Sequence, residues 1–402
     1  MGATVSNLIY GEMAPPEGAS ILEMNDEHTD LATDKSCPVF TEAMARKFDF
    51  PKVQLHLHLD GAVRYTTLWE MCSKKNMPVE GCTDIESFKK ALISTKPGNL
   101  SQVLEAFRII LPRLAGDLES VERLAYETCE DQHNNGVIYF EARYAPHFLA
   151  NTGPGIDYDK TYHKDGPVKA DDVIRAVHRG FARAKADFGV EARSILCCIR
   201  AHDEWNQEIL KLVDEFRDSG VVAIDIAGCA DGADEKYEPS AIMVFKKAYE
   251  LGIHRTVHSG EAGTDKEVIM AIEEMHAERI GHGYRIMRNP EEYKKRFVDS
   301  HEHHLEACPY SSVMTGSVPL NWPAHPIKTW IADGVNFSLS CDDPTCFDNT
   351  VCTELELVHT RIGLTKHQLW QTQLNGARAA FCNDELKQQI VDKILKAEPP
   401  KE

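Results

Sequence analysis

The feature that most constrains the fold is an alternation of short apolar runs with longer segments of helical periodicity, which begins after Phe40 and continues almost to the carboxyl end. The apolar runs lie at 53–59, 137–144, 194–199, 221–227, 255–258, 279–281, 304–307 and 335–339. Segments with helical spacing between them include 171–187, 206–218, 240–251 and 265–277. Alternating strands and helices predict a parallel α/β architecture. Because eight runs are present, we expect a closed (β/α)8 TIM barrel rather than an open sheet.

The barrel is predicted to form one domain between two poorly structured ends. Residues 1–36 contain two consecutive prolines and little periodicity, so we expect a flexible amino-terminal extension. A single metal-dependent barrel domain is expected over residues 37–390, followed by a polar tail over 391–402. The connection 62–135 between the first two strands is long and helical in texture. It predicts extra helices over the carboxyl-terminal mouth of the barrel.

Charge and composition exclude several classes of partner. The 402 residues include 44 basic and 63 acidic ones, and this net charge of −19 argues against binding to nucleic acids or anionic membranes. No apolar run approaches the ~18 residues that a membrane-spanning helix needs. Residues 1–12 lack the basic start and apolar core of a secretory signal, which favours a cytoplasmic location. An N-myristoylation pattern is present at Gly2, but no basic segment follows it, and we favour a chance match.

The twelve cysteines show no C-x-x-C spacing, which argues against a zinc finger or a thioredoxin-like redox pair. They are scattered through the chain, and several lie inside apolar stretches. We therefore expect free and mostly buried thiols, as in a protein of the reducing cytosol.

Histidines at the ends of predicted strands mark a candidate metal site. His56 and His58 alternate with leucines, so both side chains point to one face of the first strand, although two core histidines would give the same pattern. His258 ends a later strand, and Glu261 follows in a glycine-rich turn, where it could act as a general acid or base or, alternatively, begin a helix. His282 lies between two glycines at the end of another strand. It could bind a ligand or transfer a proton.

Two adjacent carboxylates, Asp342 and Asp343, end the last predicted strand. Neighbouring acids repel each other unless a cation or a proton intervenes, so one could complete a metal site while the other contacts a substrate. A solvated turn before Pro344 is the alternative interpretation. Since the carboxyl ends of barrel strands carry active sites, we expect the histidines and an aspartate to converge there. Such a set suits catalytic Zn²⁺ with one coordination position left for water.

Longer motifs resemble the adenosine deaminase family of the amidohydrolase superfamily, in its vertebrate form. They follow the family order from about residue 50 to 385 and leave only the two ends uncovered. The matching stretches are LHLHLDGA from Leu55, ARSILCCIR from Ala192, VVAID-x-AG from Val221, HRTVHSGE from His254, ERIGHGY from Glu278, CPYSS from Cys308 and SLSCDDP from Ser338. The resemblance implies a barrel that binds one Zn²⁺ per chain. It also implies hydrolytic deamination of adenosine and 2′-deoxyadenosine, which yields inosine or 2′-deoxyinosine and ammonia.

The resemblance assigns the catalytic roles to named residues. Glu261 would protonate N1 of the purine, and His282 would orient the attacking water and take part in its deprotonation. The zinc ligands would be His56, His58, His258 and Asp342.

Further residues would bind the nucleoside according to the same resemblance. Asp60 would bind the ribose 5′-hydroxyl, with His58 beside it as a second substrate contact. Gly228 would donate its N–H to N3. Asp343 would donate to N7, and because N7 is an acceptor, this carboxyl must carry a proton. The segment 100–107 would form a hydrophobic lid.

Two alternatives stay open from the sequence. An AMP deaminase or another amidohydrolase would need cations at a 5′-phosphate, where Asp60 would place a repelling carboxylate. A catalytically silent nucleoside-binding protein would keep the fold, although no implied metal ligand is missing. The resemblance further implies a monomer with a small-molecule substrate. A cytoplasmic enzyme of this kind could also have a cell-surface or extracellular pool.

Overall fold

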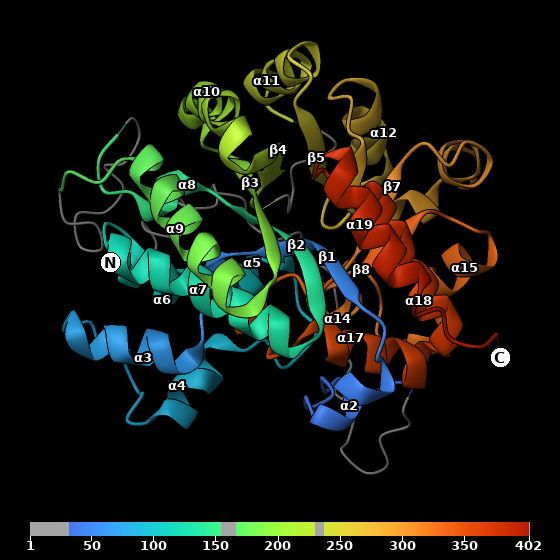
Figure 1. Ribbon diagram of the computed structural model, residues 1–402, viewed down its shortest axis with the longest axis horizontal. Helices are drawn as coiled ribbons and strands as arrows, with labels where there is room; N and C mark the ends of the chain where they lie inside the picture. Colours follow the sequence, from blue (N-terminus) through green and yellow to red (C-terminus); the bar gives the residue numbers. More distant parts are fainter. Residues whose placement is uncertain (1–31, 154–165, 230–236, 402) are drawn as a thin grey trace, which may run out of the picture.

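Eight parallel strands follow one another in chain order and curve into a barrel surrounded by helices (Figure 1). The computed structural model describes residues 32–153, 166–229 and 237–401. The strands are β1 (Lys52–His58), β2 (Val137–Tyr144), β3 (Glu191–Ile199), β4 (Val221–Ala227), β5 (His254–Ser259), β6 (Arg279–His282), β7 (His304–Ala307) and β8 (Phe337–Leu339). All eight predicted strands are present, and β2, β4 and β7 have the predicted bounds. The predicted (β/α)8 barrel is therefore confirmed.

The barrel closes through a residue beyond its last strand. Asp342 accepts a hydrogen bond from the backbone N–H of His58 (2.9 Å) and donates its own N–H to the carbonyl of His56 (3.2 Å). Asp342 has a φ of 64°, in the left-handed region that L-residues other than glycine seldom adopt. The closing bonds thus hold a strained residue against the carboxyl end of β1.

The helices outside the barrel are amphipathic, as their sequence spacing predicts. In α9 (Ala170–Phe188), Val173, Val177 and Phe181 are buried at helical spacing against the barrel, and Gly189 ends the helix with a φ of 73°. The other outer helices are α7 (Leu118–Asn134), α10 (Asn206–Phe216), α11 (Pro239–Glu250), α12 (Asp265–Glu273), α15 (Pro326–Ala332), α18 (Lys366–Ala379) and α19 (Asp384–Leu395).

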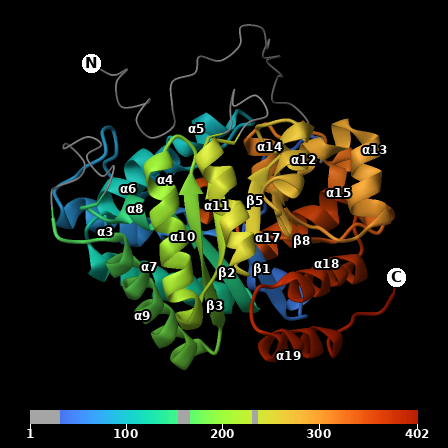
Figure 2. The same cartoon turned by 90° about the horizontal axis from the view of Figure 1, so that it is seen from above.

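Additional helices between β1 and β2 reach over one end of the barrel, as predicted. They are α3 (Tyr65–Lys74), α4 (Ile85–Leu92), α5 (Leu100–Leu104) and α6 (Phe107–Leu114). Figure 2 shows α5 at the end where the carboxyl termini of the strands lie, together with α12 and α14 (Pro309–Met314), whereas α19 lies at the opposite end. The Asn99 side chain caps α5 by accepting a hydrogen bond from the N–H of Gln102 (2.9 Å).

The described part of the predicted amino-terminal extension is bound to the barrel. The indole Nε1 of Trp322 donates to the carbonyl of Asp34 (2.7 Å), and Arg361 forms an ion pair with the Asp34 carboxylate (2.8 Å). The Tyr310 hydroxyl donates to the carbonyl of Lys35 (3.0 Å). The myristoylation pattern at Gly2 lies outside the described residues.

All twelve cysteines are free thiols, as predicted, and all except Cys37, Cys82 and Cys229 are buried. Among the helices of residues 32–153, 166–229 and 237–401, none combines the length and the apolar character needed to cross a membrane.

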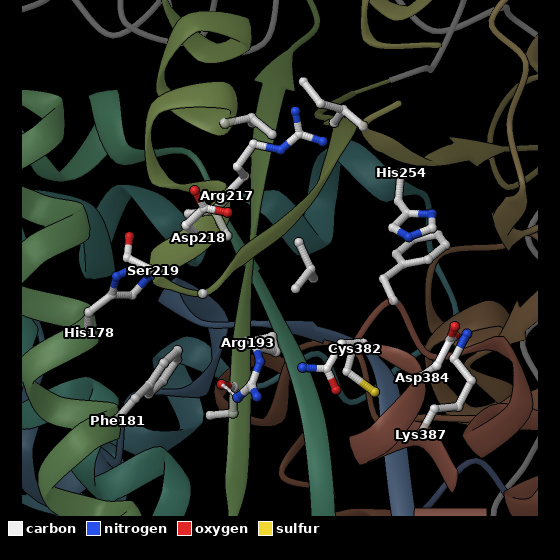
Figure 3. Close-up of a pocket in the computed structure, with 18 of the residues that line it drawn as sticks. His178, Phe181, Arg193, Arg217, Asp218, Ser219, His254, Cys382, Asp384 and Lys387 are labelled. Atoms are coloured by element: carbon white, nitrogen blue, oxygen red, sulfur yellow. Dashed lines mark hydrogen bonds between the residues drawn. The ribbon is translucent and has the colours of Figure 1, made fainter. Parts of the chain in front are cut away.

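A groove of about 810 Å³ lies at the amino-terminal end of the barrel (Figure 3). Phe181 and His178 of α9 form one side, and His254 and Lys387 lie across the groove from them. The remaining walls come from the loop before β4 and from the turn between α18 and α19. The groove therefore combines the ends of elements that are far apart in the sequence.

Most of the basic side chains that line this groove are paired with neighbouring carboxylates. Lys185 and Arg193 both pair with Glu191, at 2.5 and 3.1 Å. Burial lowers the pKa of His178 to about 4, so this imidazole is neutral at physiological pH. Two further pairs are Arg217 with Asp214 and His254 with Glu278. The groove therefore presents little net positive charge to an anion.

Candidate active site

The histidines and the aspartate singled out in the sequence converge at the carboxyl end of the barrel. His58 Nε2 lies 3.1 Å from His258 Nε2 and 3.5 Å from Asp342 Oδ1. His56 Nε2 lies 3.2 Å from the same carboxylate oxygen, and His282 Nε2 lies 3.9 Å from Asp342 Oδ2. Residues from β1, β5, β6 and the segment after β8 thus direct their polar atoms at one point.

These polar atoms have the properties of metal ligands. His56 Nε2 and Asp342 Oδ1 are buried and have no hydrogen-bond partner among the described residues. Burial lowers the pKa of His58 and of His258, which favours the neutral imidazoles that bind metals. A cation between these nitrogens and the carboxylate would satisfy all of them. The cluster fits a metal ion, and its imidazole and carboxylate donors are ligands that zinc accepts.

Two buried carboxylates orient the imidazole rings of His56 and His258 through their Nδ1 atoms. His56 Nδ1 lies 2.8 Å from Glu306, and His258 Nδ1 lies 2.9 Å from Asp225. The guanidinium of Arg143 joins the two carboxylates, at 2.6 Å from Glu306 and 2.9 Å from Asp225. Burial alone would raise the pKa of both acids, but nearby positive groups, Arg143 among them, hold it well below its usual range. Both acids therefore stay ionised and fix the orientation of the rings.

Glu261 lies in the loop between β5 and α12, so it does not begin a helix. Its side chain lines the cavity, is 6% exposed and has Oε2 3.5 Å from His282 Nε2. Burial, with a smaller contribution from the Asp342 charge, raises the pKa of Glu261 to about 8. At neutral pH this carboxyl carries a proton that it can donate.

Two further carboxyls, Asp60 and Asp343, line the same cavity. Each is buried and has one oxygen, Oδ1, without a hydrogen-bond partner among the described residues. Burial raises the pKa of Asp60 to about 7, and burial with the neighbouring Asp342 charge raises that of Asp343 well above its usual range. Gly61 makes room for this arrangement, because a Cβ there would lie 1.9 Å from Asp343 Oδ1. Asp343 is thus a protonated group and a hydrogen-bond donor.

The rest of the cavity is apolar and narrow. Its volume is about 60 Å³, and Gly228 faces it directly after β4 with a φ of 98°. The apolar side chains come from the lid segment and from the neighbouring strand ends; they are Leu100, Val103, Leu104, Phe107, Phe148, Ile199 and Phe347. A flat apolar molecule with polar edges would match this lining.

The matches to known proteins agree with this geometry. The family model for adenosine deaminase matches residues 51–397. The chain belongs to the adenosine deaminase family. It is 37% identical over 351 residues to the adenosine deaminase of Danio rerio, which covers 87% of this chain and 96% of the relative. This member of the adenosine deaminase family is a hydrolytic deaminase.

Two solved structures share the fold. The N6-methyl-AMP deaminase of Arabidopsis thaliana is 25% identical, with a TM-score of 0.72 and coverage of 89% of this chain and 99% of its own. A zinc-bound amidohydrolase from Burkholderia ambifaria is 24% identical, with a TM-score of 0.72 and coverage of 91% and 100%. At this identity the second comparison shows the shared fold.

In this adenosine deaminase family member, the residues that support the cluster were not predicted from the sequence. Arg143, Asp225 and Glu306 each lie inside a buried strand. Ser311 of α14 donates a hydrogen bond to Asp342 Oδ2 (2.6 Å). A charged residue inside an apolar run is the signal that could have revealed the first three, because burial of an isolated charge is very costly. Ser311 lies in the CPYSS stretch that carries the family resemblance, but nothing in that stretch assigns it a contact with Asp342.

Proposed function

We propose that this chain hydrolyses adenosine and 2′-deoxyadenosine to inosine or 2′-deoxyinosine and ammonia, with one Zn²⁺ as cofactor. The observation that carries the proposal is the position of protonated Glu261 beside the cluster of imidazoles and Asp342, inside a narrow apolar cavity. The adenosine deaminase named above, at 37% identity, supports the same reaction.

The metal would be held by His56, His58, His258 and Asp342, whose polar atoms lie close together. When bound, Zn²⁺ acts as a Lewis acid that makes hydroxide available near neutral pH. Ser311, Glu306 and Asp225 would keep the ligands oriented.

Glu261 and His282 would move the protons of the reaction. Attack of the water oxygen on C6 pushes electrons onto N1, and Glu261 would donate its proton to N1 at this stage. His282, 3.5 Å from Glu261, would orient the water and assist in its deprotonation. Collapse of the tetrahedral carbon then breaks the C6–N bond and releases ammonia. The proton that His282 takes from the water would pass to the departing amino nitrogen, and the remaining hydroxyl proton would return to Glu261 as the C6=O bond forms. The water thus supplies both the oxygen and the protons of the products.

Three residues at the cavity edge would orient the nucleoside. Gly228 would give its N–H to N3, and protonated Asp343 would donate to N7. Asp60 would bind the 5′-hydroxyl, with His58 nearby. None of these proposed contacts involves C2′ of the sugar, so we expect adenosine and 2′-deoxyadenosine to be accepted alike.

The lining of the cavity disfavours a nucleotide substrate. Among the described residues that line it there is no lysine or arginine, whereas Asp60, Glu261, Asp342 and Asp343 are all acidic. A 5′-phosphate would meet the carboxyl of Asp60 and no basic lysine or arginine side chain of the described lining, which is unfavourable in a buried site. We therefore favour a nucleoside over AMP or N6-methyl-AMP.

The test is the ultraviolet absorbance change when purified protein is mixed with adenosine, 2′-deoxyadenosine or AMP. We expect turnover of both nucleosides and little turnover of AMP. Activity should disappear after chelator treatment and return with zinc. Efficient deamination of AMP would overturn the nucleoside assignment, and full activity in a protein shown to be metal-free would overturn the cofactor assignment.

A further inference from the structure

A second buried ion pair lies behind the turn that carries Glu261. Arg200, directly after β3, pairs with Glu267 of α12 at 2.6 Å, and the two residues are only 5% and 1% exposed. Neither of them lines the cavity, and neither has a role in the chemistry proposed above. Because an unpaired charge is very costly at such depth, the two side chains stay together. The pair is therefore a fixed connection between β3 and α12.

Each member of the pair binds one backbone group of the turn. Glu267 Oε2 accepts a hydrogen bond from the N–H of Gly260, the residue immediately before Glu261 (3.0 Å). Arg200 Nη2 donates to the carbonyl of His258 (3.1 Å). The same nitrogen makes the ion pair with Glu267. The two charges thus hold the turn at two points, on either side of Ser259.

The surroundings fit closely around both charges. A Cβ at Gly263 would lie 2.2 Å from Glu267 Oε2, so a side chain at this position would displace the carboxylate. The guanidinium carbon of Arg200 lies 4.6 Å from the ring centroid of Tyr237, a cation–π contact. The hydroxyl of Tyr237 donates a second hydrogen bond to the carbonyl of His258 (3.0 Å). The turn therefore has one defined position relative to β3 and α12.

We propose that Arg200 and Glu267 are positioning residues for proton transfer. Together they fix the turn, and with it the place of the Glu261 carboxyl relative to the cluster of imidazoles and Asp342. The proposal rests on the proposed function, in which Glu261 is the proton donor. Misplacement of a reacting group by about 1 Å can lower a rate about 10²-fold, so a loosened turn should lower kcat. KM for adenosine should change little, because the groups proposed to bind the nucleoside lie outside this turn.

The first experiment shortens the carboxylate arm. Glu267→Asp keeps a negative charge opposite Arg200, but with one CH₂ fewer the carboxylate cannot reach both Arg200 and the N–H of Gly260. In zinc-supplemented full-length protein, kcat for adenosine should fall about 10–100-fold, with KM within about threefold and one zinc per chain by elemental analysis. The matched control is Glu238→Asp, since Glu238 accepts the N–H of Ala201 (3.2 Å) rather than a group of the turn. Its kcat should stay within twofold. A kcat for Glu267→Asp equal to that of the control would overturn the proposal.

The second experiment separates positioning from stability. Arg200→Met leaves the Glu267 charge buried without its partner, so both the unfolding temperature and kcat should fall. The double variant Arg200→Met/Glu267→Met buries neither charge. It should unfold at a higher temperature than Arg200→Met, while its kcat stays about 10–100-fold below that of the unmodified protein.

Arg200→Lys is the conservative variant. Because a single nitrogen of Arg200 makes both the ion pair and the bond to the carbonyl of His258, an ammonium group can replace it. Unfolding temperature and kcat should therefore both lie closer to those of the unmodified protein than in Arg200→Met. Recovery of kcat together with stability in the double variant would assign a merely structural role to the pair. Recovery of stability without kcat in Arg200→Lys would equally contradict the proposal.

Assay of the unmodified protein with adenosine, run in parallel, distinguishes the two possible failures. If the unmodified protein deaminates adenosine and Glu267→Asp is equally active, the positioning role is wrong and the proposed function stands. If the unmodified, zinc-supplemented protein does not deaminate adenosine, the proposed function is wrong, and the positioning role is rejected with it.

Discussion

The two ends of the barrel differ both in the volume of their cavities and in the polar groups that line them, and the larger cavity is not the proposed active site. The groove at the amino-terminal end measures about 810 Å³, whereas the cavity at the carboxyl-terminal end measures about 60 Å³. Yet several buried polar atoms without a hydrogen-bond partner among the described residues line the small cavity, whereas most of the basic side chains of the large groove are paired with carboxylates. Unsatisfied polar groups that converge on one point therefore identify the site better than the size of a cavity does.

A buried chain of charges connects the two ends. Glu306, which orients His56, pairs with Arg279 (2.7 Å), and Arg279 pairs with Glu141 (2.5 Å) near the amino-terminal end. Glu141 in turn accepts a hydrogen bond from the backbone N–H of Phe381 (2.6 Å), at the wall of the groove. Along this path every charge has an opposite partner. Buried polar atoms without a hydrogen-bond partner among the described residues, such as Asp60 Oδ1, Asp342 Oδ1 and Asp343 Oδ1, lie at the carboxyl-terminal end, where a metal and a substrate can satisfy them.

The largest effect is expected when the proton donor at the carboxyl-terminal end, Glu261, is replaced. Glu261→Gln keeps the shape of the side chain and cannot donate a carboxyl proton, so kcat for adenosine should fall about 10²–10⁴-fold. The matched control is Glu191→Gln at the amino-terminal groove, which should change kcat less than twofold. Both proteins should retain one zinc per chain by elemental analysis. Near-normal turnover by folded, zinc-loaded Glu261→Gln would exclude Glu261 as the acid.

A second test addresses the support of the metal ligands. Ser311→Ala removes the hydrogen bond that Ser311 donates to Asp342, so the affinity for zinc should fall about 10–100-fold, as for other groups that orient metal ligands. Competition with a chromophoric chelator measures the effect. Ser312→Ala is the neighbouring control, because Ser312 bonds to the carbonyl of Pro309 and to His325 rather than to Asp342. Equal affinities in the two variants would contradict the role of Ser311.

The sequence predicted the barrel and the convergence because both follow from simple periodicities. Apolar runs define the strands, and the parallel order places His56, His258 and Asp342 at one end. The backbone conformation of individual site residues could not be predicted from these periodicities. His282 and Asp342 adopt φ values of 65° and 64°, which the surrounding backbone imposes on residues that do not favour them. The amino-terminal groove was also missed, since it is assembled from element ends that no local pattern connects.

The pH profile provides a third test of the carboxyl-terminal end. Burial raises the pKa of Glu261 to about 8, and the protonated form is the active one. The required species is therefore present below this pKa and is lost as the pH rises through it. We expect log(kcat/KM) to fall with a slope near −1 above about pH 8. The descending limb should be absent from the residual activity of Glu261→Gln; an unchanged limb would assign it to another group.

A fourth and smaller effect concerns stability. Glu354 of α17 (Val351–Leu357) is buried near Asp342, and burial raises its pKa to about 8 from a reference of 4.5. The folded state thus binds the proton more tightly than the unfolded state, and this contribution to stability, complete below about pH 4.5, is lost as the pH rises to 8.

Glu354→Gln has no proton to lose at this position. Relative to the variant, the unmodified protein should lose about 3 kcal/mol of unfolding free energy between pH 5 and 8. Urea denaturation of both proteins at the two pH values measures the difference. The contributions of all other titrating groups to the unfolding free energy are the same in both proteins and cancel. Parallel pH dependences would contradict the raised pKa of Glu354 in the folded protein.

The smallest expected effect is at the amino-terminal groove. Lys387 lines it, and no carboxylate of the described residues lies within ion-pair distance, so Lys387→Ala should change the unfolding free energy by less than about 0.5 kcal/mol. It should also leave kcat/KM for adenosine within twofold, because the groups that bind and react lie at the other end of the barrel. Thermal unfolding and steady-state kinetics measure both quantities. A tenfold loss of activity with unchanged stability would mean that the groove communicates with the site, most directly through Phe381 and the buried chain from Glu141 to His56.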